Sequence, residues 1–258
     1  MFAEIMTLLS LLRKAHNPVR RQFLGKGRRF KSFSRYYFKI KMLILGIDEA
    51  GRGPVIGPLI IAGAMFNEKD LPKLKSLDVK DSKLLTIKQI NELRKKIEKI
   101  AVKTEVIKAY PKEIDEAVEG KNNLNLNWLE AHKQTEIINK LKSDKAIIDC
   151  PSTNIKKFKN YLQNLLKVKT ELIVEHKADV KYVACSAASI IAKSVREEEV
   201  AKIEKFVGES IGSGYPSNPI CQEFIKHNID KYPEIFRKSW MTYKNHKTAK
   251  MQKKLNEF

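Results

Sequence analysis

The chain is predicted to be an α/β protein, with a mixed β-sheet covered by helices and a helical C-terminal portion. Short apolar runs alternate with amphipathic stretches from residue 42 onward, which is typical of strands interleaved with helices. Hydrophobic residues make up 43% of 258 residues, enough to bury a sizeable core. The apolar stretches fall well short of the roughly 20 residues that span a bilayer, so no membrane association is expected.

The elements are predicted in order from these patterns. Strands at residues 44–47 and 59–66 are joined by the Gly/Pro-rich segment GRGPVIGP. Thr86 and Gln89 form a capping box that opens a helix over about 86–100. The later elements are a strand at 102–109, a helix at 125–141, a strand at 146–149, a helix at 155–165, a strand at 172–175, a long helix at 180–206, and then a loop and short helices.

The charge balance indicates a polyanionic partner. Fifty Lys and Arg against 30 Asp and Glu give a net charge of +20, which favours nucleic acid over a membrane surface. Residues 1–41 contain 11 basic residues against the single acid Glu4. They could be a basic arm, a targeting-like leader or sequence upstream of the true start, and we favour the last because Met42 directly opens the first strand.

The three cysteines are widely spaced and match neither a disulfide framework nor a zinc site. This usage predicts a reducing, cytoplasmic compartment. We expect a monomer.

Acidic residues stand at the ends of several predicted core elements. Asp48 and Glu49 end the first strand, Asp149 ends a later one, and Asp179 begins the long helix. Such residues can converge at one sheet edge, and an all-carboxylate set suits Mg²⁺ or Mn²⁺ rather than zinc. Two such ions could cleave a phosphodiester.

Each acid also has a structural explanation. Asp149 or Asp179 alone could be a helix cap or a loop residue. Asp48 with Glu49 is harder to explain in that way, because adjacent strand side chains point to opposite faces and one would then face the core unpaired.

Several ordered sequence blocks over about 42–247 resemble the ribonuclease HII family, the type 2 ribonucleases H, and most closely its archaeal branch. The longest block is GIDEAGRGPVIGPLIIAGA, which starts at Gly46. The others are DSKL at 81–84, NLNWLE at 125–130, IID at 147–149, KAD at 177–179, AASIIAK at 187–193, GSGYP at 212–216 and RKSW at 237–240.

The resemblance implies a ribonuclease H-like fold and a metal-dependent endonuclease. Such an enzyme would cut the RNA strand of RNA/DNA hybrids and incise 5′ of ribonucleotides embedded in duplex DNA, leaving 3′-hydroxyl and 5′-phosphate ends, in DNA replication and repair. The catalytic metal ligands carried over by position are Asp48, Glu49, Asp149 and Asp179.

In the resembling family, the glycine–arginine–glycine element and a tyrosine read the ribonucleotide and the deoxyribose that follows it. Here these residues are Gly51, Arg52, Gly53 and Tyr215. The alternatives are a plain tight turn for the glycines and a packing aromatic for Tyr215. Two further residues, Lys83 and Lys193, are candidate phosphate contacts, although most lysines in so basic a chain are merely solvated.

The C-terminal tail spaces Gln252, Leu255 and Phe258 at positions one, four and seven. This spacing is similar to the motif by which replication proteins dock on the sliding clamp, and the alternative is a frayed polar tail. The predicted organisation is therefore a basic extension at 1–41, a catalytic domain at 42–210, a substrate-binding helical portion at 211–250 and the tail at 251–258.

Two other function classes compete with this hypothesis. A nucleic-acid-binding module without catalysis accounts for the charge but not for acids in a cleft that binds phosphate. Another metal-dependent nuclease or strand-transferase on the same fold is the closer alternative, because a fold does not determine its substrate.

Overall fold

A computed structural model describes residues 42–77 and 85–256, with side chains described as far as Gln252. The chain divides into the units Met1–Ile40 and Lys41–Phe258, and the description below concerns the second. The predictions for residues 1–41, for Lys83 and for Phe258 lie outside the described residues, as does the side chain of Leu255.

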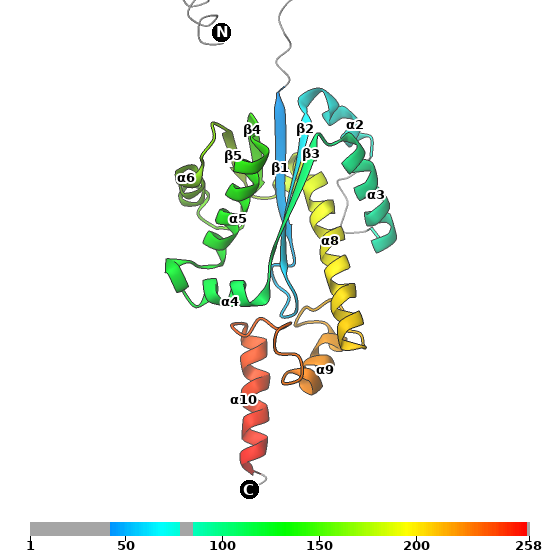
Figure 1. Ribbon diagram of the computed structural model, residues 1–258, viewed down its shortest axis with the longest axis vertical. Helices are drawn as coiled ribbons and strands as arrows, with labels where there is room; N and C mark the ends of the chain where they lie inside the picture. Colours follow the sequence, from blue (N-terminus) through cyan, green and yellow to red (C-terminus); the bar gives the residue numbers. More distant parts are fainter. Residues whose placement is uncertain (1–41, 78–84, 257–258) are drawn as a thin grey trace, which may run out of the picture. The chain divides into compact units, whose positions relative to one another are not determined.

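A five-stranded mixed sheet forms the centre of this unit (Figure 1). Its strand order is β3-β2-β1-β4-β5; β1 pairs antiparallel with β2 and parallel with β4, β2 and β3 are antiparallel, and β4 and β5 are parallel. The strands are β1 (Leu43–Ala50), β2 (Leu59–Asn67), β3 (Lys103–Ala109), β4 (Lys145–Asp149) and β5 (Glu171–Glu175). The carboxyl ends of β1, β4 and β5 consequently lie at one edge of the sheet.

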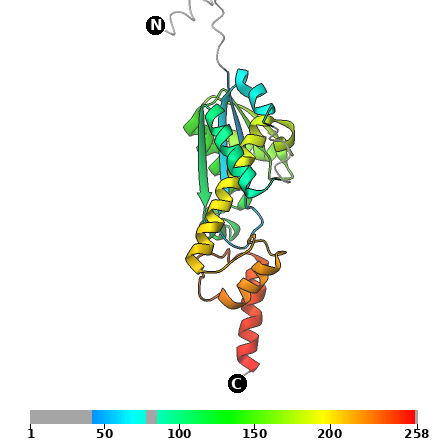
Figure 2. The same cartoon turned by 90° about the vertical axis from the view of Figure 1, so that its right-hand side faces the viewer.

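Helices cover both faces of the sheet (Figures 1 and 2). One face packs on α8 (Val183–Val207), α3 (Ile87–Ile100) and α2 (Leu71–Lys75), and the other on α5 (Leu126–Leu141) and α6 (Ile155–Leu165). Successive β1 residues alternate between the two cores, so Ile44 belongs to the α8 side and Leu45 to the α5 side. The remaining helices are α4 (Pro111–Val118), α7 (Ala178–Lys181), α9 (Pro219–Asn228), α10 (Met241–Asn256) and the one-turn 3₁₀ helices Glu68–Asp70 and Lys121–Asn123.

A third, smaller core joins the segment after β1 to the C-terminal helices. Val55 and Ile56 are fully buried against residues of α9 and α10, including Phe224 and Tyr243. Backbone hydrogen bonds reinforce this packing: Arg237 N–H donates to Val55 O at 2.9 Å. The segment between β1 and β2 is therefore held in place by a part of the chain that lies about 180 residues further along the sequence.

Most predicted elements are confirmed within a residue or two. The capping box is present, because Thr86 accepts from Gln89 N–H at 3.3 Å and donates its own N–H to Gln89 Oε1 at 2.8 Å. The three cysteines are buried free thiols. Among the described residues, no helix is both long and apolar enough to cross a membrane.

The predicted helix at 180–206 is wrong at its start. Tyr182 is extended, with φ −119° and ψ 117°, and separates α7 from α8. Its carbonyl accepts from the N–H groups of Cys185 and Ser186, and its hydroxyl donates to Glu175 Oε1 at 3.0 Å. The two carbonyl bonds begin α8, and the hydroxyl bond ties Tyr182 to β5. Asp179 therefore lies on α7 rather than at the start of α8.

Candidate active site

Two predicted acids lie side by side on neighbouring parallel strands. The β1–β4 register pairs Ile47 with Ile148, and the next residues along the strands are Asp48 and Asp149. Neighbouring strands are about 4.8 Å apart, so the two carboxylates start from adjacent backbone positions. Asp179, on α7, follows the adjacent strand β5 and raises the pKa of both aspartates through charge repulsion.

Asp48 faces α8 and is nearly buried. Burial is the main cause that raises its pKa to about 7, and the nearby charges of Asp149 and Asp179 add to the effect. Hydrogen bonds from the Ser189 side chain and from the Glu49 N–H, at 2.8 Å, oppose the shift. The site thus holds a carboxylate whose negative charge is only partly compensated by the protein.

Glu49 points to the opposite face of β1, as strand geometry requires. Burial first and the charge of Glu130 second raise its pKa well above the usual value. Its Oε2 is buried and has no hydrogen-bond partner in the described chain. An orphaned carboxylate oxygen of this kind is suited to a cation.

Asp149 and Asp179 are held by the backbone around α7. Asp149 Oδ1 accepts from Ala178 N–H at 2.9 Å, and burial is the main cause of a raised Asp149 pKa. The carbonyl of Asp179 accepts a short hydrogen bond from the Ser186 hydroxyl. The Asp149 carboxylate thus binds the first N–H of α7 from another element and also interacts electrostatically with the other acids.

The four acids are not arranged as a preformed metal site. Within residues 42–77 and 85–256, no group of three or more His, Cys, Asp or Glu side chains is placed to hold an ion. Asp48 and Glu49 leave β1 on opposite faces, and like charges repel one another in a partly dehydrated site. The donor chemistry nevertheless fits a hard divalent cation, since every predicted ligand is a carboxylate.

Arg52 is bound to α5 by two side chains that the sequence analysis did not single out. Its Nε donates to Glu130 Oε1 at 2.8 Å and its Nη2 donates to Asn127 Oδ1 at 2.7 Å. Glu130 is fully buried, and burial raises its pKa to about 7 although Arg52 opposes the shift. Both residues lie in the NLNWLE block, and only the tertiary contact shows what they bind.

The structure brings the predicted ribonucleotide-reading residues together. Gly51 has φ +80°, a conformation that favours glycine, and a Cβ there would come within 2.7 Å of Arg196 Nε. A Cβ on Gly53 would lie 3.2 Å from the Tyr215 ring. Tyr215 is 43% exposed, so it is a surface aromatic and not a core one, which leaves both substrate contact and packing at the rim as its role.

The remaining predicted residues are less informative. Lys193 is half-buried on α8, the helix that packs against β1. Gln252 is exposed on α10, and this helix continues into the predicted tail.

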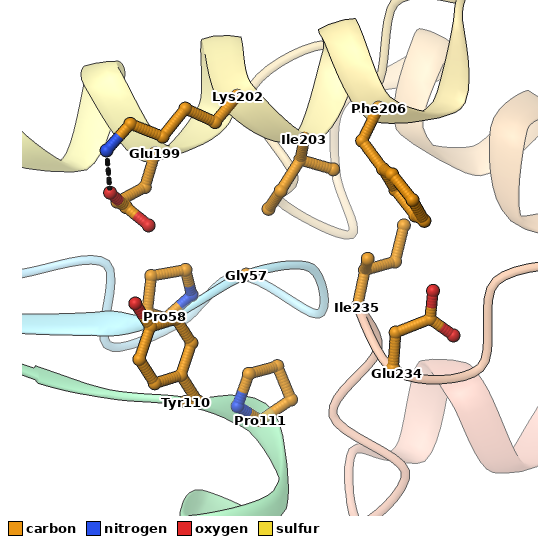
Figure 3. Close-up of a pocket in the computed structure, with 10 residues that line it drawn as sticks. All are labelled: Gly57, Pro58, Tyr110, Pro111, Glu199, Lys202, Ile203, Phe206, Glu234 and Ile235. Atoms are coloured by element: carbon orange, nitrogen blue, oxygen red, sulfur yellow. Dashed lines mark hydrogen bonds and ion pairs between the residues drawn. The ribbon is translucent and has the colours of Figure 1, made fainter.

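A pocket of about 270 Å³ lies beside Gly57 and Pro58, in the segment between β1 and β2 (Figure 3). Its walls come from the loop before β2, from the start of α4, from α8 and from the segment before Arg237, and none of the four acids lines it. Its lining is mainly apolar, and its two α8 ions, Glu199 and Lys202, bind each other at 2.7 Å. The four predicted catalytic acids are therefore separate from the lining of this pocket.

Comparison with known proteins agrees with the geometry. The family model described as Ribonuclease HII matches residues 45–243. The chain belongs to the ribonuclease HII family. It is accordingly a ribonuclease H, a hydrolase with endonuclease activity.

Several archaeal members of the ribonuclease HII family are similar to this chain. Ribonuclease HII of Methanococcus maripaludis strain C5 is 45% identical over 212 residues, covering 79% of this chain and 86% of that protein. The crystal structure of the ribonuclease H2 from Pyrococcus horikoshii OT3 matches with a TM-score of 0.74 and 40% identity, over 81% of this chain and 98% of that one. The structure of the PCNA:RNase HII complex from Archaeoglobus fulgidus matches with a TM-score of 0.71 and 38% identity, over 79% of this chain and 96% of that one. The predicted fold and family are thereby confirmed.

Proposed function

We propose that the protein hydrolyses the RNA strand of RNA/DNA hybrids and incises 5′ of single ribonucleotides in duplex DNA, leaving 3′-hydroxyl and 5′-phosphate ends. Membership in the ribonuclease HII family supports the hydrolysis. The observation that carries the finer proposal is a glycine loop that directly follows β1, the strand of Asp48 and Glu49, with the exposed Tyr215 ring beside Gly53.

The four acids Asp48, Glu49, Asp149 and Asp179 would hold two Mg²⁺ or Mn²⁺ ions. Two such ions, when bound, activate a water and stabilise the leaving oxygen of a phosphodiester. The buried, unpartnered Oε2 of Glu49 and the raised pKa of Asp48 support this assignment, because both indicate negative charge that the protein alone does not compensate. The chain's own part is to hold these oxygens at the carboxyl edge of β1 and β4.

The ribonucleotide would be recognised by close approach. Gly51 and Gly53 carry no Cβ, so the loop backbone can reach the 2′-hydroxyl, which is the group that distinguishes RNA from DNA. Tyr215 presents an exposed ring beside Gly53 on which a sugar can pack. Arg52, held by Glu130 and Asn127, retains exposed donors for a phosphate, and we propose Lys83 and Lys193 as further phosphate contacts.

The decisive experiment uses one labelled DNA duplex that contains a single ribonucleotide, an all-DNA duplex of the same sequence and an RNA/DNA hybrid, each with and without Mg²⁺. We expect metal-dependent incision 5′ of the ribonucleotide and within the hybrid, and none of the DNA duplex. Cutting of all-DNA duplex would instead support another nuclease or a strand-transferase. Binding without cleavage would support the non-catalytic module.

We further propose that the protein acts as a cytoplasmic monomer on ribonucleotides left by DNA replication, and that its C-terminal tail binds the sliding clamp. The relative from Archaeoglobus fulgidus forms a complex with PCNA, and α10 carries the first residue of the predicted motif, Gln252, on its exposed surface. Removing residues 255–258 should weaken binding to purified PCNA without changing cleavage of a short duplex. An unchanged affinity would favour the simple polar tail.

A further inference from the structure

Arg237 is fully buried, and its guanidinium group donates hydrogen bonds to the backbone of the loop that follows β1. Its Nη2 donates to Gly51 O at 2.6 Å, its Nη1 to Arg52 O at 2.8 Å and its Nε to Gly57 O at 3.0 Å. An arginine that spreads its guanidinium over three carbonyls fixes the path of that backbone, because the five donors form a rigid planar fork.

Arg196 lies on the other side of the same loop, where it meets the segment that carries Tyr215. It is 4% exposed, and its Nη2 donates to Ile56 O at 2.9 Å. Its Nε and Nη1 are buried without a hydrogen-bond partner in the described chain. Gly51 and Gly214 have φ values of +80° and +73°, which favour glycine, and a Cβ on them would lie 2.7 Å and 3.1 Å from atoms of the Arg196 side chain.

These two charges are costly to bury. Burial lowers the pKa of both guanidinium groups, to about 9 for Arg237, and each also lacks an ion pair in the described residues. A buried charge without a paired carboxylate usually lowers stability. The three carbonyl bonds of Arg237 compensate part of this cost, whereas Arg196 is left incompletely paired, and both arginines hold the same loop.

The bonds to Arg237 determine which way the loop's donors face. No described peptide bond is cis, and in a trans peptide the C=O and the following N–H point in opposite directions. Because the carbonyls of Gly51 and Arg52 turn inward to Arg237, the N–H groups of Arg52 and Gly53 turn outward. Two outward N–H groups beside the exposed Tyr215 ring form a small surface of fixed donors.

The backbone network joins this surface to Tyr215. Val55 N–H donates to Gly214 O at 2.9 Å, and Gly57 N–H donates to Ile235 O at 2.8 Å. The loop, the tyrosine segment and the segment before Arg237 are thus cross-linked at several points.

We propose that Arg237, assisted by Arg196, is a positioning residue that aims the Arg52 and Gly53 N–H groups at the ribonucleotide and sets their spacing from Tyr215. This inference rests on the proposed function. Neither arginine touches substrate; both act through the loop. Their loss should lower the turnover of bound duplex more than it lowers duplex binding, which depends mainly on phosphate contacts.

The test compares Arg237→Lys and Arg196→Met with the wild-type chain on the single-ribonucleotide duplex, by kcat, KM, duplex affinity and melting temperature. Lysine keeps the charge of residue 237 but cannot span three carbonyls, so we expect kcat to fall at least tenfold with duplex affinity within threefold of wild type. Methionine removes a buried, incompletely paired charge from residue 196, so the melting temperature should be unchanged or higher while kcat falls. Arg94→Lys is the matched control, because Arg94 binds Glu98 and Glu198 on the helical face away from the loop and should retain full activity.

A double-mutant cycle with Tyr215→Ala provides a readout that a merely structural role would not give. If Arg237 acts through the spacing to Tyr215, then Arg237→Lys should cost less in the Tyr215→Ala background than in the wild type. Wild-type kcat in both arginine variants, additive losses, or losses that follow the melting temperature would overturn the inference alone. A wild-type chain that does not incise the duplex would overturn the proposed function, and the inference with it.

Discussion

At the residue scale, the end of β1 places one carboxylate on each face of the sheet. Asp48 turns toward Ser189 on α8, whereas Glu49 turns toward Glu130 on α5, because successive side chains of β1 alternate. Each carboxylate is buried enough for its pKa to rise, so the protein only partly stabilises their ionised forms. A bound cation would compensate the remaining negative charge. Replacing either carboxylate with a neutral side chain should therefore weaken cation binding.

Asp48→Asn and Asp149→Asn should each lower cleavage of the ribonucleotide duplex by at least a thousandfold, since a catalytic metal ligand is removed while side-chain volume is kept. Duplex binding should change little, because it depends on basic residues. Cleavage assays and filter binding on the same preparations check this. Asp144→Asn, whose carboxylate accepts from Leu43 N–H at the opposite end of the strands, is the control; retained cleavage in either active-site variant would contradict the ligand assignment.

Divalent metal should stabilise the folded protein more at high pH than at low pH. The folded-state pKa of Asp48 is raised from 3.8 to about 7, so its contribution to stability is present below about pH 4 and is lost as the pH rises through about 7. Ionised Asp48 is also the form that would bind a cation. At a metal concentration about 100 times the dissociation constant, stabilisation of about 2.7 kcal/mol should raise the melting temperature by ~5–10 °C above about pH 8.

The same melting experiment at about pH 5.5 should show a much smaller shift, because the metal must displace a proton. Asp48→Asn should reduce the shift at high pH. An equal shift at both pH values, or an equal shift in the variant, would contradict the assignment of Asp48 as a ligand.

The sequence could identify some site residues but not others, for a physical reason. The acids stand at strand ends and Gly51 and Gly53 punctuate a turn, which are local patterns that a sequence displays. The roles of Glu130 and Arg237 depend on burial and on partners about 78 and 186 residues away, which no local pattern encodes.

At the element scale, the site depends on how closely β1 approaches α8. Gly46 lies directly against this helix, and a Cβ there would lie 2.1 Å from Ala184 C and 2.2 Å from Ala184 O. Two positions further along β1, Asp48 receives its hydrogen bond from Ser189. The small residues on both elements therefore let the strand end reach the helix side chain.

Gly46→Ala should lower the free energy of unfolding by at least about 1–3 kcal/mol, the usual cost of overpacking, because the clash is with backbone that cannot rotate away. Gly63→Ala on the neighbouring strand β2 is the matched control, since there the atom closest to a new Cβ belongs to a side chain, Ile137 Cγ2 at 2.4 Å. Urea denaturation of both variants provides the measurement. A larger loss for Gly63→Ala would show that the β1–α8 contact tolerates expansion.

The elements themselves were largely predictable because their apolar periods are regular. The break at Tyr182 was not, because it is stabilised by a hydrogen bond to Glu175 on another element. The short helix α4 was not predicted either: it begins with Pro111 and spans only eight residues, too few to establish a helical period. Local sequence patterns thus describe long elements well and describe interruptions poorly.

At the scale of the whole molecule, a strongly basic chain carries an acidic site. The net charge of +20 attracts a duplex over a long range, whereas the carboxylates at the strand ends repel phosphate until cations compensate them. Binding and cleavage should therefore respond to different ions: monovalent salt weakens binding, and divalent metal controls cleavage.

Half of this net charge comes from residues 1–41, and a chain that starts at Met42 separates the two effects. The described site uses residues 48–240, so we expect kcat on the ribonucleotide duplex to remain within about twofold of the full chain, a difference below ~0.5 kcal/mol. The affinity at low salt should fall, and the slope of log affinity against log salt should become shallower by about 0.9 for each phosphate that the shorter chain no longer neutralises. Duplex titrations at several salt concentrations measure the slope, and single-turnover cleavage measures the rate. A tenfold or greater loss of kcat would show that the basic segment takes part in catalysis, and would contradict our preference for sequence upstream of the true start.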